Sequence, residues 1–374
     1  MLPSIRPGET GEVELSIGPV DSIYSAEVWL TVHFQLKYSQ LWAASRHEIA
    51  WFQTRLNRDQ EQNRSLPPQL ASARGLQLQT TKLDWIIGND LFEICFDRSS
   101  GGISSWKSGN QSILVADDKC VSTIVPSFWR APTDNDKPRN DPYWKNFGIN
   151  AMTTQTRSVS IKRLDSGSLE ITGQLFLSPP ILDWGYDCNM IYRINDEGSV
   201  QIDVKLKPTG KAPSHLPRVG LNVRVARSFD FVKYFGLGPG EAYPDKKSSQ
   251  QIGIYKSQIK NLTVYYEVPQ ENGNHMDARY VQLQDQRSST CIDVARLNGN
   301  FCWAVDRYAP DEIEQARHPC DLKEDSALTL RLDVAVAGVG TGACGPDVLP
   351  EHQVSCKDYD FQFELRAVSG AAFD

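Results

Sequence analysis

The chain has 374 residues, of which 40% are apolar and 23% are charged, and its formal net charge is −7 at pH 7. This composition is typical of a folded globular protein and excludes global disorder. The net negative charge disfavours nucleic acids and anionic membranes as partners, because those surfaces require concentrated Lys and Arg. The length exceeds that of an average domain, so we expect one large domain with a smaller piece, or two domains.

The N-terminal residues and the cysteines bear on the cellular compartment. The first eight residues lack the apolar stretch of a secretory signal, and no apolar run elsewhere is long enough to span a bilayer. The eight cysteines are far apart and form no C-x-x-C pair, which predicts reduced thiols and neither a zinc site nor a redox centre. These features predict a cytoplasmic protein.

Three segments near the N-terminus alternate apolar and polar residues with the period of two that is typical of antiparallel strands. They lie at residues 12–17, 26–34 and 48–52. An immunoglobulin-like sandwich needs about seven such strands, so we interpret residues 1–56 as a partial immunoglobulin-like β-sandwich. The polar, proline-containing residues 57–75 follow it and are predicted to form a linker.

Residues 76–374 are predicted to form one large antiparallel β domain. Strand patterns occur at residues 91–96, 158–164, 168–176, 201–206, 219–226, 259–267, 328–337 and 359–367. Two short helices are expected, one that begins with Asp141 as N-cap and Pro142, and one over residues 310–318. Strands and helices do not alternate along the chain, so the fold class is all-β, and neither a Rossmann fold nor a TIM barrel is encoded.

The densest group of polar residues is the segment 128–141, in which aromatic residues lead into a charged loop. A rigid sheet that presents such a loop is typical of a binding site. Pro138 and Arg139 stand where a calcium-binding loop needs a further oxygen ligand and a glycine, which argues against that kind of site. Alternatively, the Asp and Asn side chains only satisfy the backbone of a turn. The residues alone leave both interpretations open.

Three further segments combine turn residues with polar side chains. Residues 235–247 contain G-x-G-x-G but lack the Lys-Ser/Thr ending of a phosphate-binding loop, so they predict tight turns. Residues 269–275 hold a carboxylate, amides and an imidazole, which we interpret as a structural turn. Residues 335–350 carry four glycines after a strand, and they predict either close approach to another surface or an irregular crossover. No pair of carboxylates is singled out for glycosidase chemistry.

These segments together resemble the C-terminal domain of the β-galactosidases of glycoside hydrolase family 2. The matching motifs are FWRAPTDND at residues 128–136, LGPGEAYPD at 237–245, QENG at 270–273 and GVGTGACGPDVLP at 338–350. Residues 27–32 and 50–53 resemble the last strands of the immunoglobulin-like domain that precedes this domain in the family. The resemblance implies a galactose-mutarotase-like β-supersandwich over residues 76–374, preceded by the partial immunoglobulin-like sandwich.

The resemblance also implies a function. The chain is expected to be the C-terminal part of an enzyme that hydrolyses terminal β-D-galactosides such as lactose through a galactosyl-enzyme intermediate. In that family the catalytic glutamates and the magnesium and sodium sites belong to the TIM barrel. This chain is therefore expected to hold no catalytic residue, metal or cofactor and to be inactive alone. Its expected partners are the remaining domains or a large subunit and the galactoside, and the complete enzyme is expected to be an oligomer.

Two loops carry the contribution to the sugar pocket that the resemblance implies. One closes near the active site and the other reaches the aglycone side; their residues are Asp134, Asn135, Asp136, Lys137 and Arg139, and Ala343, Cys344, Gly345 and Pro346. Bacterial relatives have a tryptophan where Cys344 stands. A cysteine cannot stack on a sugar ring, so the aglycone contacts should differ, and the ACGP form resembles fungal-type members.

Two other interpretations stay open from the sequence. A stand-alone carbohydrate-binding or mutarotase-like β-sandwich protein has the same architecture, but an enzyme of that kind needs a His and Glu pair in a concave sheet. The six histidines suggest no such pair. A structural interaction module would bind no sugar at all.

Overall fold

The computed structural model describes residues 5–17, 27–57, 75–117, 121–340 and 347–369. These residues belong to two compact units, Met1–Gln62 and Asn63–Asp374. The prediction of an all-β fold is confirmed, because strands make up nearly all the regular structure of both units.

The first unit contains one antiparallel pair, β1 (Trp29–Gln35) and β2 (Glu48–Arg55). The strand predicted at residues 12–17 is wrong, since this segment has no regular secondary structure. An alternating pattern becomes a strand only where a neighbour takes up its backbone hydrogen bonds. The described residues of this unit provide no such neighbour for residues 12–17.

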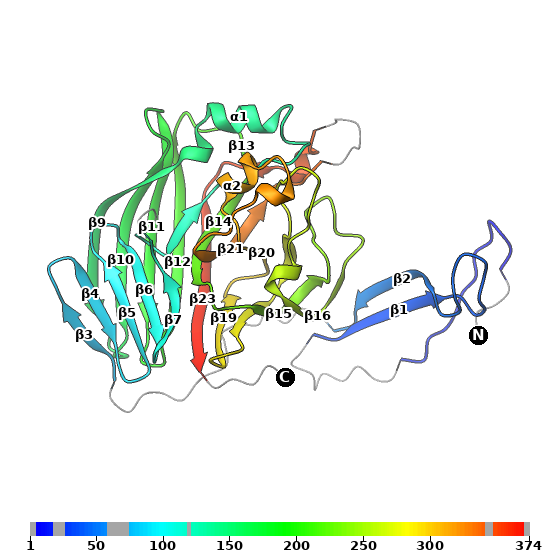
Figure 1. Cartoon of the computed structure of the whole chain (residues 1–374), viewed down its shortest axis with the longest axis horizontal. Coiled ribbons are helices and arrows are strands. Elements are labelled where there is room, and N and C mark those ends of the chain that lie inside the picture. Colours follow the sequence, from blue (N-terminus) through cyan, green and yellow to red (C-terminus); the bar gives the residue numbers. More distant parts are fainter. Residues whose placement is uncertain (1–4, 18–26, 58–74, 118–120, 341–346, 370–374) are drawn as a thin grey trace. The chain divides into compact units, whose positions relative to one another are not determined.

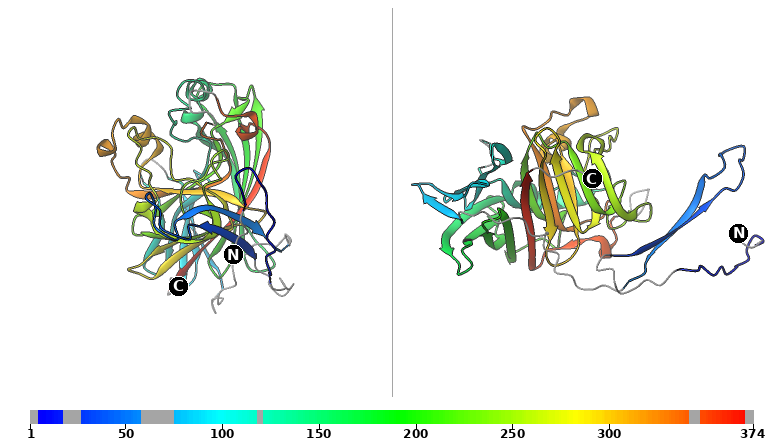
Figure 2. Two further views of the ribbon diagram at one scale, coloured as in Figure 1. Left: turned by 90° about the vertical axis from the view of Figure 1, so that its right-hand side faces the viewer. Right: turned by 90° about the horizontal axis from the view of Figure 1, so that it is seen from below.

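The second unit is built on two large antiparallel sheets, which Figures 1 and 2 show from three directions. In spatial order, the nine-stranded sheet consists of β16 (Gln251–Gln258), β15 (Phe231–Gly238), β18 (Tyr280–Asp285), β19 (Thr290–Arg296), β23 (Tyr359–Ser369), β12 (Ser199–Gly210), β11 (Trp184–Ile194), β10 (Leu169–Ser178) and β9 (Thr153–Arg163). The neighbouring strands β9 to β12 form a meander of consecutive hairpins.

The ten-stranded sheet has its own order. It consists of β17 (His275–Ala278), β20 (Phe301–Asp306), β21 (Ala327–Val336), β14 (Arg218–Ala226), β7 (Gln111–Val115), β6 (Gly102–Ser108), β5 (Phe92–Asp97), β4 (Asp84–Gly88) and β3 (Gln77–Thr80), with β8 (Ile124–Ser127) paired to β14. A small separate pair joins β13 (His215–Leu216) and β22 (Val354–Ser355).

One apolar core fills the space between the two large sheets. Alternate residues of each strand point into it, as the period of two predicts. The rings of Phe96 and Tyr192 meet edge to face, with centroids 5.3 Å apart, and Phe128 stacks on Tyr186 at 4.9 Å. Trp106 is fully buried there. The core holds the sandwich as a rigid support for its loops.

Helices are short in the described part of the unit. They are α1 (Asn140–Asn146), α2 (Pro310–Gln315) and the 3-10 turns η1 (Ile149–Ala151), η2 (Ile259–Asn261), η3 (Pro319–Asp321) and η4 (Pro350–His352). Both α-helices lie at the same end of the sandwich (Figure 1). The predicted N-cap Asp141 is wrong, because the N-cap of α1 is Arg139. The N–H of Asp141 donates to the carbonyl of Asp136, so this residue already belongs to a hydrogen-bonded turn and the helix begins before it.

The strand predicted at residues 259–267 is also wrong. The segment begins as η2 and then continues without regular structure. The side chain of Asn272 explains part of this, since its Oδ1 accepts the N–H of Val264 at 3.0 Å in place of a strand neighbour. The segment is therefore a loop and not a strand.

Candidate functional site

The LGPGEAYPD and QENG segments meet through a buried carboxylate. Glu241 Oε2 accepts the backbone N–H of Gly273 at 2.9 Å. Its Oε1 accepts bonds from Lys246 Nζ and the Tyr266 hydroxyl, both at 2.5 Å. Burial alone would raise the pKa of Glu241, but these hydrogen bonds hold it below its usual value. Glu241 is thus a fixed, ionised link between the two segments.

Asp134 ties the predicted pocket loop, residues 134–140, to the QENG segment. Gln270 donates from Nε2 to Asp134 Oδ2 at 3.1 Å and accepts the backbone N–H of Asp134 at 3.0 Å. Lys137 Nζ lies 2.8 Å from Asp134 Oδ1, and the hydrogen bond from Lys137 lowers the pKa of this carboxyl. The side chains of Asp134 and Lys137 are 63% and 46% exposed. Both are within reach of a ligand.

Asp136 is fully buried beside Arg130. Arg130 Nη2 donates to the two carboxylate oxygens at 2.9 and 3.0 Å, and neither side chain has any exposed area. The same guanidinium donates to the carbonyl oxygens of Ala337 at 2.7 Å and Gly338 at 2.8 Å. Asp136 therefore fixes the loop to the backbone that follows β21 and is not a surface group.

The other predicted residues fall into two groups. Asn135 Nδ2 donates to the carbonyl of Val339 at 2.8 Å, and Arg139 is exposed directly before α1. The second predicted turn, with Ala343, Cys344, Gly345 and Pro346, lies outside the described residues. The structure brings the first loop together with QENG and the backbone after β21. That either loop contacts a sugar stays a prediction.

Beneath these loops lies a buried ion cluster. Its members are the buried Arg130, Asp136, Arg218, Glu271, Arg331 and Asp333, together with Asp306, whose side chain is 15% exposed. Arg331 Nη1 donates to both oxygens of Glu271, at 2.7 and 2.6 Å, and its Nε lies 3.0 Å from Asp306 Oδ2. Arg218 Nε donates to Asp333 Oδ1 at 2.8 Å. The cluster therefore joins the QENG loop to strands β14, β20 and β21.

Strand register explains why these charges meet. Asp333 stands opposite Gly220, and Arg331 opposite Ala304. A Cβ on Gly220 would lie 2.1 Å from Asp333 Oδ1, so this glycine leaves the space that the Arg218–Asp333 pair occupies. The sequence feature that could have indicated the cluster is the alternation of charged residues with leucines in β21. Such a pattern ordinarily indicates a solvent-facing side, but here the loops cover it.

The charges in the cluster do not balance, since three guanidinium groups face four carboxyl groups. Burial raises the pKa of Asp306 and of Asp333 to about 6, although Arg331 and Arg218 act in the opposite direction. In the folded protein these two carboxyl groups therefore hold protons up to about pH 6.

The chemistry open to these loops is binding and positioning. A retaining glycosidase needs two carboxylates about 5 Å apart that face the substrate. In the described part of the loops, Glu241, Glu271 and Asp136 are buried, and each is held by a cation. Asp134 and Lys137 offer exposed hydrogen-bonding groups instead.

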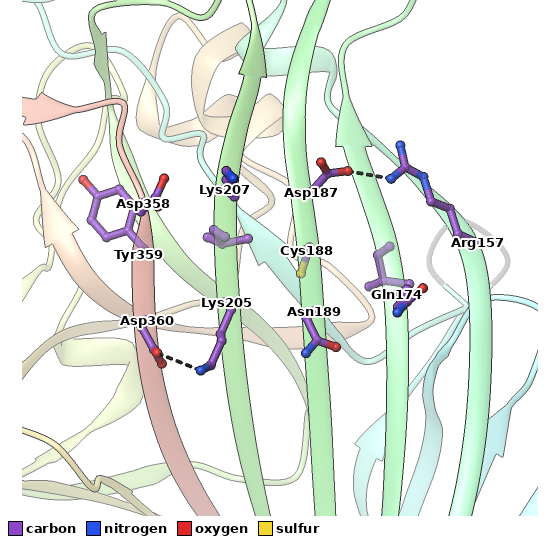
Figure 3. A pocket seen from close by; sticks show the side chains of 12 residues that line it. Arg157, Gln174, Asp187, Cys188, Asn189, Lys205, Lys207, Asp358, Tyr359 and Asp360 are labelled. Atoms are coloured by element: carbon purple, nitrogen blue, oxygen red, sulfur yellow. Dashed lines mark hydrogen bonds and ion pairs between the residues drawn. The ribbon is translucent and has the colours of Figure 1, made fainter.

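A separate groove of about 460 Å³ lies on the nine-stranded sheet (Figure 3). Its charged residues are largely paired across strands, Arg157 with Asp187 at 2.6 Å and Lys205 with Asp360 at 3.2 Å. None of the residues that line it comes from the four motif segments, and none is a histidine or a glutamate. The groove thus lacks the His and Glu pair that a mutarotase-like site requires.

Neither a metal-binding cluster nor a membrane-spanning helix occurs in the described segments. The described segments contain no group of three or more His, Cys, Asp or Glu side chains arranged to hold a metal ion. Within them, no helix has the length and apolar character needed to cross a bilayer.

Several curated proteins resemble the chain over most of its length. A β-galactosidase of Kluyveromyces lactis is 31% identical over 97% of the chain, and one of Actinobacillus pleuropneumoniae is 23% identical over 91%. A third, from Staphylococcus xylosus, is 24% identical over 90%. The chain spans about a third of the length of these relatives, 33%, 32% and 32%.

Solved structures with a similar arrangement include a galactose mutarotase related enzyme from Lactobacillus acidophilus. It has a TM-score of 0.41 and 10% identity, and the match covers 77% of this chain and 98% of that one. An aldose epimerase homologue from C. elegans has a TM-score of 0.40 and 9% identity, and the match covers 79% and 99% of the two chains.

Family models match both units. The model for the β-galactosidase small chain matches residues 88–365, and the model for β-galactosidase domain 4 matches residues 1–57. The first match alone spans well over half of the chain and includes the four motif segments up to the last strand. The chain therefore belongs to the β-galactosidase small-chain family.

Proposed function

We propose that this chain is the C-terminal part of a β-galactosidase, which in its complete form hydrolyses terminal β-D-galactosides such as lactose with retention of configuration. The observation that carries the proposal is the similarity to the Kluyveromyces lactis β-galactosidase, which extends over 97% of this chain and one third of the relative. The remaining two thirds of such an enzyme would supply the catalytic carboxylates.

In this proposal the chain supplies walls of the sugar pocket. Exposed Asp134 and Lys137 would contact the substrate, while Asp136, through its ion pair with Arg130 in the buried cluster, would hold the loop in place. The turn at residues 343–346 would provide the aglycone side. Partners are the remaining domains or a large subunit, magnesium and sodium would bind to those parts, and the complete enzyme would be an oligomer.

A cytoplasmic location belongs to the same proposal. Six cysteines among the described residues are free thiols, and several of them are buried in the sheets. Proteins of oxidising compartments usually pair their cysteines, so these thiols favour a reducing compartment.

Complementation tests the proposed function. The purified chain alone should leave a chromogenic β-galactoside intact, and adding the N-terminal two thirds of a β-galactosidase relative should restore hydrolysis. The control mixture contains that N-terminal fragment with the first unit only, residues 1–62, and should stay inactive. Hydrolysis by the isolated chain would contradict the proposal, and so would a stable complex, seen by sedimentation, that has no activity.

A further inference from the structure

The backbone directly after β21 is held by a carboxylate from another loop. Asp245 Oδ1 accepts the N–H of Val339 at 3.0 Å, and its Oδ2 accepts the N–H of Gly340 at 3.0 Å. Asp245 closes the LGPGEAYPD segment, so two motifs distant in the sequence meet at one side chain. Both bonds are charge-assisted, which makes them stronger than bonds between neutral groups.

The predicted pocket loop reaches the same place from the other side. Asn135 Nδ2 donates to the carbonyl of Val339 at 2.8 Å. The peptide groups around Val339 are therefore held by Asp245 through their N–H groups and by Asn135 through a carbonyl. We call Asn135, Asp245, Val339 and Gly340 the Val339 joint.

Two glycines give the joint its close fit. Gly340 has φ +110°, a conformation that L side chains rarely adopt, and a Cβ there would lie 2.4 Å from Asn135 Nδ2. A Cβ on Gly338 would lie 2.5 Å from Asp245 Oδ2. Any side chain at either position would push one of the two holding residues away. This contact accounts for two of the four glycines in the GVGTGACGPDVLP segment.

We propose that Asp245 is a positioning residue for the sugar pocket. Asp245 fixes the backbone of residues 339 and 340 through its two hydrogen bonds. Because Asn135 donates to the carbonyl of Val339, the position of this backbone also determines the position of loop 134–140. This inference rests on the proposed function, in which loop 134–140 walls the substrate pocket, and it adds the residue that fixes the position of this loop. Asp245 acts through the backbone and through Asn135, without touching substrate itself.

The isosteric change Asp245→Asn tests the joint directly. The amide keeps one accepting oxygen but turns an NH₂ group toward the second backbone N–H, so one bond is lost and two donors face each other. A hydrogen bond to a charged group contributes on the order of 1.5 kcal/mol, which converts to about tenfold in an equilibrium.

Amide hydrogen exchange on the chain itself gives the first measurement. In Asp245→Asn, the amides of residues 339 and 340 should exchange about tenfold faster than in the wild type. Gly338→Ala should have the same effect at residue 340, because its Cβ would displace Asp245 Oδ2, the acceptor of that amide. It provides a second route should the first variant fold poorly. Unchanged protection of these amides in a folded variant would overturn the proposal.

Matched controls separate the joint from general effects. Asp358→Asn makes the same chemical change at an exposed aspartate. Gly299→Ala places a Cβ at φ +130°, but the nearest atom would be 3.8 Å away. Both should leave the exchange of residues 339 and 340 unaltered. Faster exchange there in either control would show that the effect is not specific to the joint and would also count against the proposal.

Kinetics of the complemented enzyme give the second measurement. A positioning role predicts that Asp245→Asn raises KM for the galactoside by about tenfold while kcat changes less. A merely structural role would lower the apparent kcat through loss of folded protein and leave KM unchanged, which would overturn the inference. If the wild-type complex is inactive, the proposed function fails, whereas the exchange data still decide whether the joint exists.

Discussion

Replacing Arg331 by methionine is expected to lower the free energy of unfolding of the larger unit by about 3–5 kcal/mol. The guanidinium is the partner of both Glu271 and Asp306, and its side chain is only 5% exposed. Methionine fills much of the volume but leaves two buried carboxylates without their cation. In a unit of this size the loss corresponds to a fall in Tm of roughly 10 °C, which differential scanning calorimetry or urea unfolding would measure.

Two comparisons make the Arg331 experiment specific. Arg317→Met removes an exposed guanidinium and should shift stability by no more than about 0.5 kcal/mol. The double variant Arg331→Met with Glu271→Gln should be less destabilised than the sum of the two single changes, because the unpaired charge is also removed. Equal stability of Arg331→Met and the wild type would show that the cluster contributes little.

The second large effect is a dependence of the unfolding free energy on pH, which comes from the raised pKa of Asp306 and Asp333. Burial raises the pKa of Asp306 and Asp333 from 3.8 to about 6 in the folded protein. Between about pH 4 and pH 6 the folded state therefore holds a proton that the unfolded state has released. The stability from this source is fully present below pH 4 and is lost as pH rises through 6. One such proton is worth on the order of 3 kcal/mol.

Asp306→Asn should weaken this dependence by about half, since it removes one of the two carboxyl groups whose pKa is raised and leaves Asp333. The measurement is the difference in unfolding free energy between variant and wild type, taken from pH 4 to pH 7.5, and it should move in favour of the variant as pH rises. The difference is informative because carboxyl groups with lowered pKa, such as Asp134 and Glu241, act in the opposite sense in both proteins. Asp358→Asn should run parallel to the wild type. A curve for Asp306→Asn that runs parallel to the wild type would contradict a raised pKa for Asp306.

Period-two alternation predicted seven strands of the larger unit, but it did not predict others such as β11, β15, β19 and β20. Strands β10, β14, β21 and β23 lie where the sequence pattern placed them, because each buries one face in the core. The pattern failed at residues 259–267, which form a 3-10 turn and a loop, and where Asn272 Oδ1 accepts the backbone N–H of Val264 in place of a strand neighbour. The pattern also failed at residues 12–17. A strand forms only if an adjacent strand accepts and donates its backbone hydrogen bonds, and the local sequence does not show whether such a strand is present.

The sequence motifs predicted which segments form the candidate site, but they did not predict which side chains in these segments contact one another. The motifs marked loop 134–140 and the GVGTGACGPDVLP segment, yet nothing local indicates that Asp136 is buried against Arg130 while Asp134 is exposed. Partners such as Glu271 and Arg331 stand sixty positions apart, on a turn and on a strand. Only the fold brings them together, so sequence reasoning assigned the first to a structural turn and the second to a plain strand.

The position of β23 bears on how the protein is made. This strand lies between β19 and β12, in the middle of the nine-stranded sheet, although about 150 residues separate it from the end of β12. During synthesis the hairpins of β9 to β12 can form early, but they must wait with an open edge until residues 359–369 have left the ribosome. An exposed edge of that length invites pairing with other chains. A nascent chain stalled before residue 359 should therefore be a preferred target of chaperones.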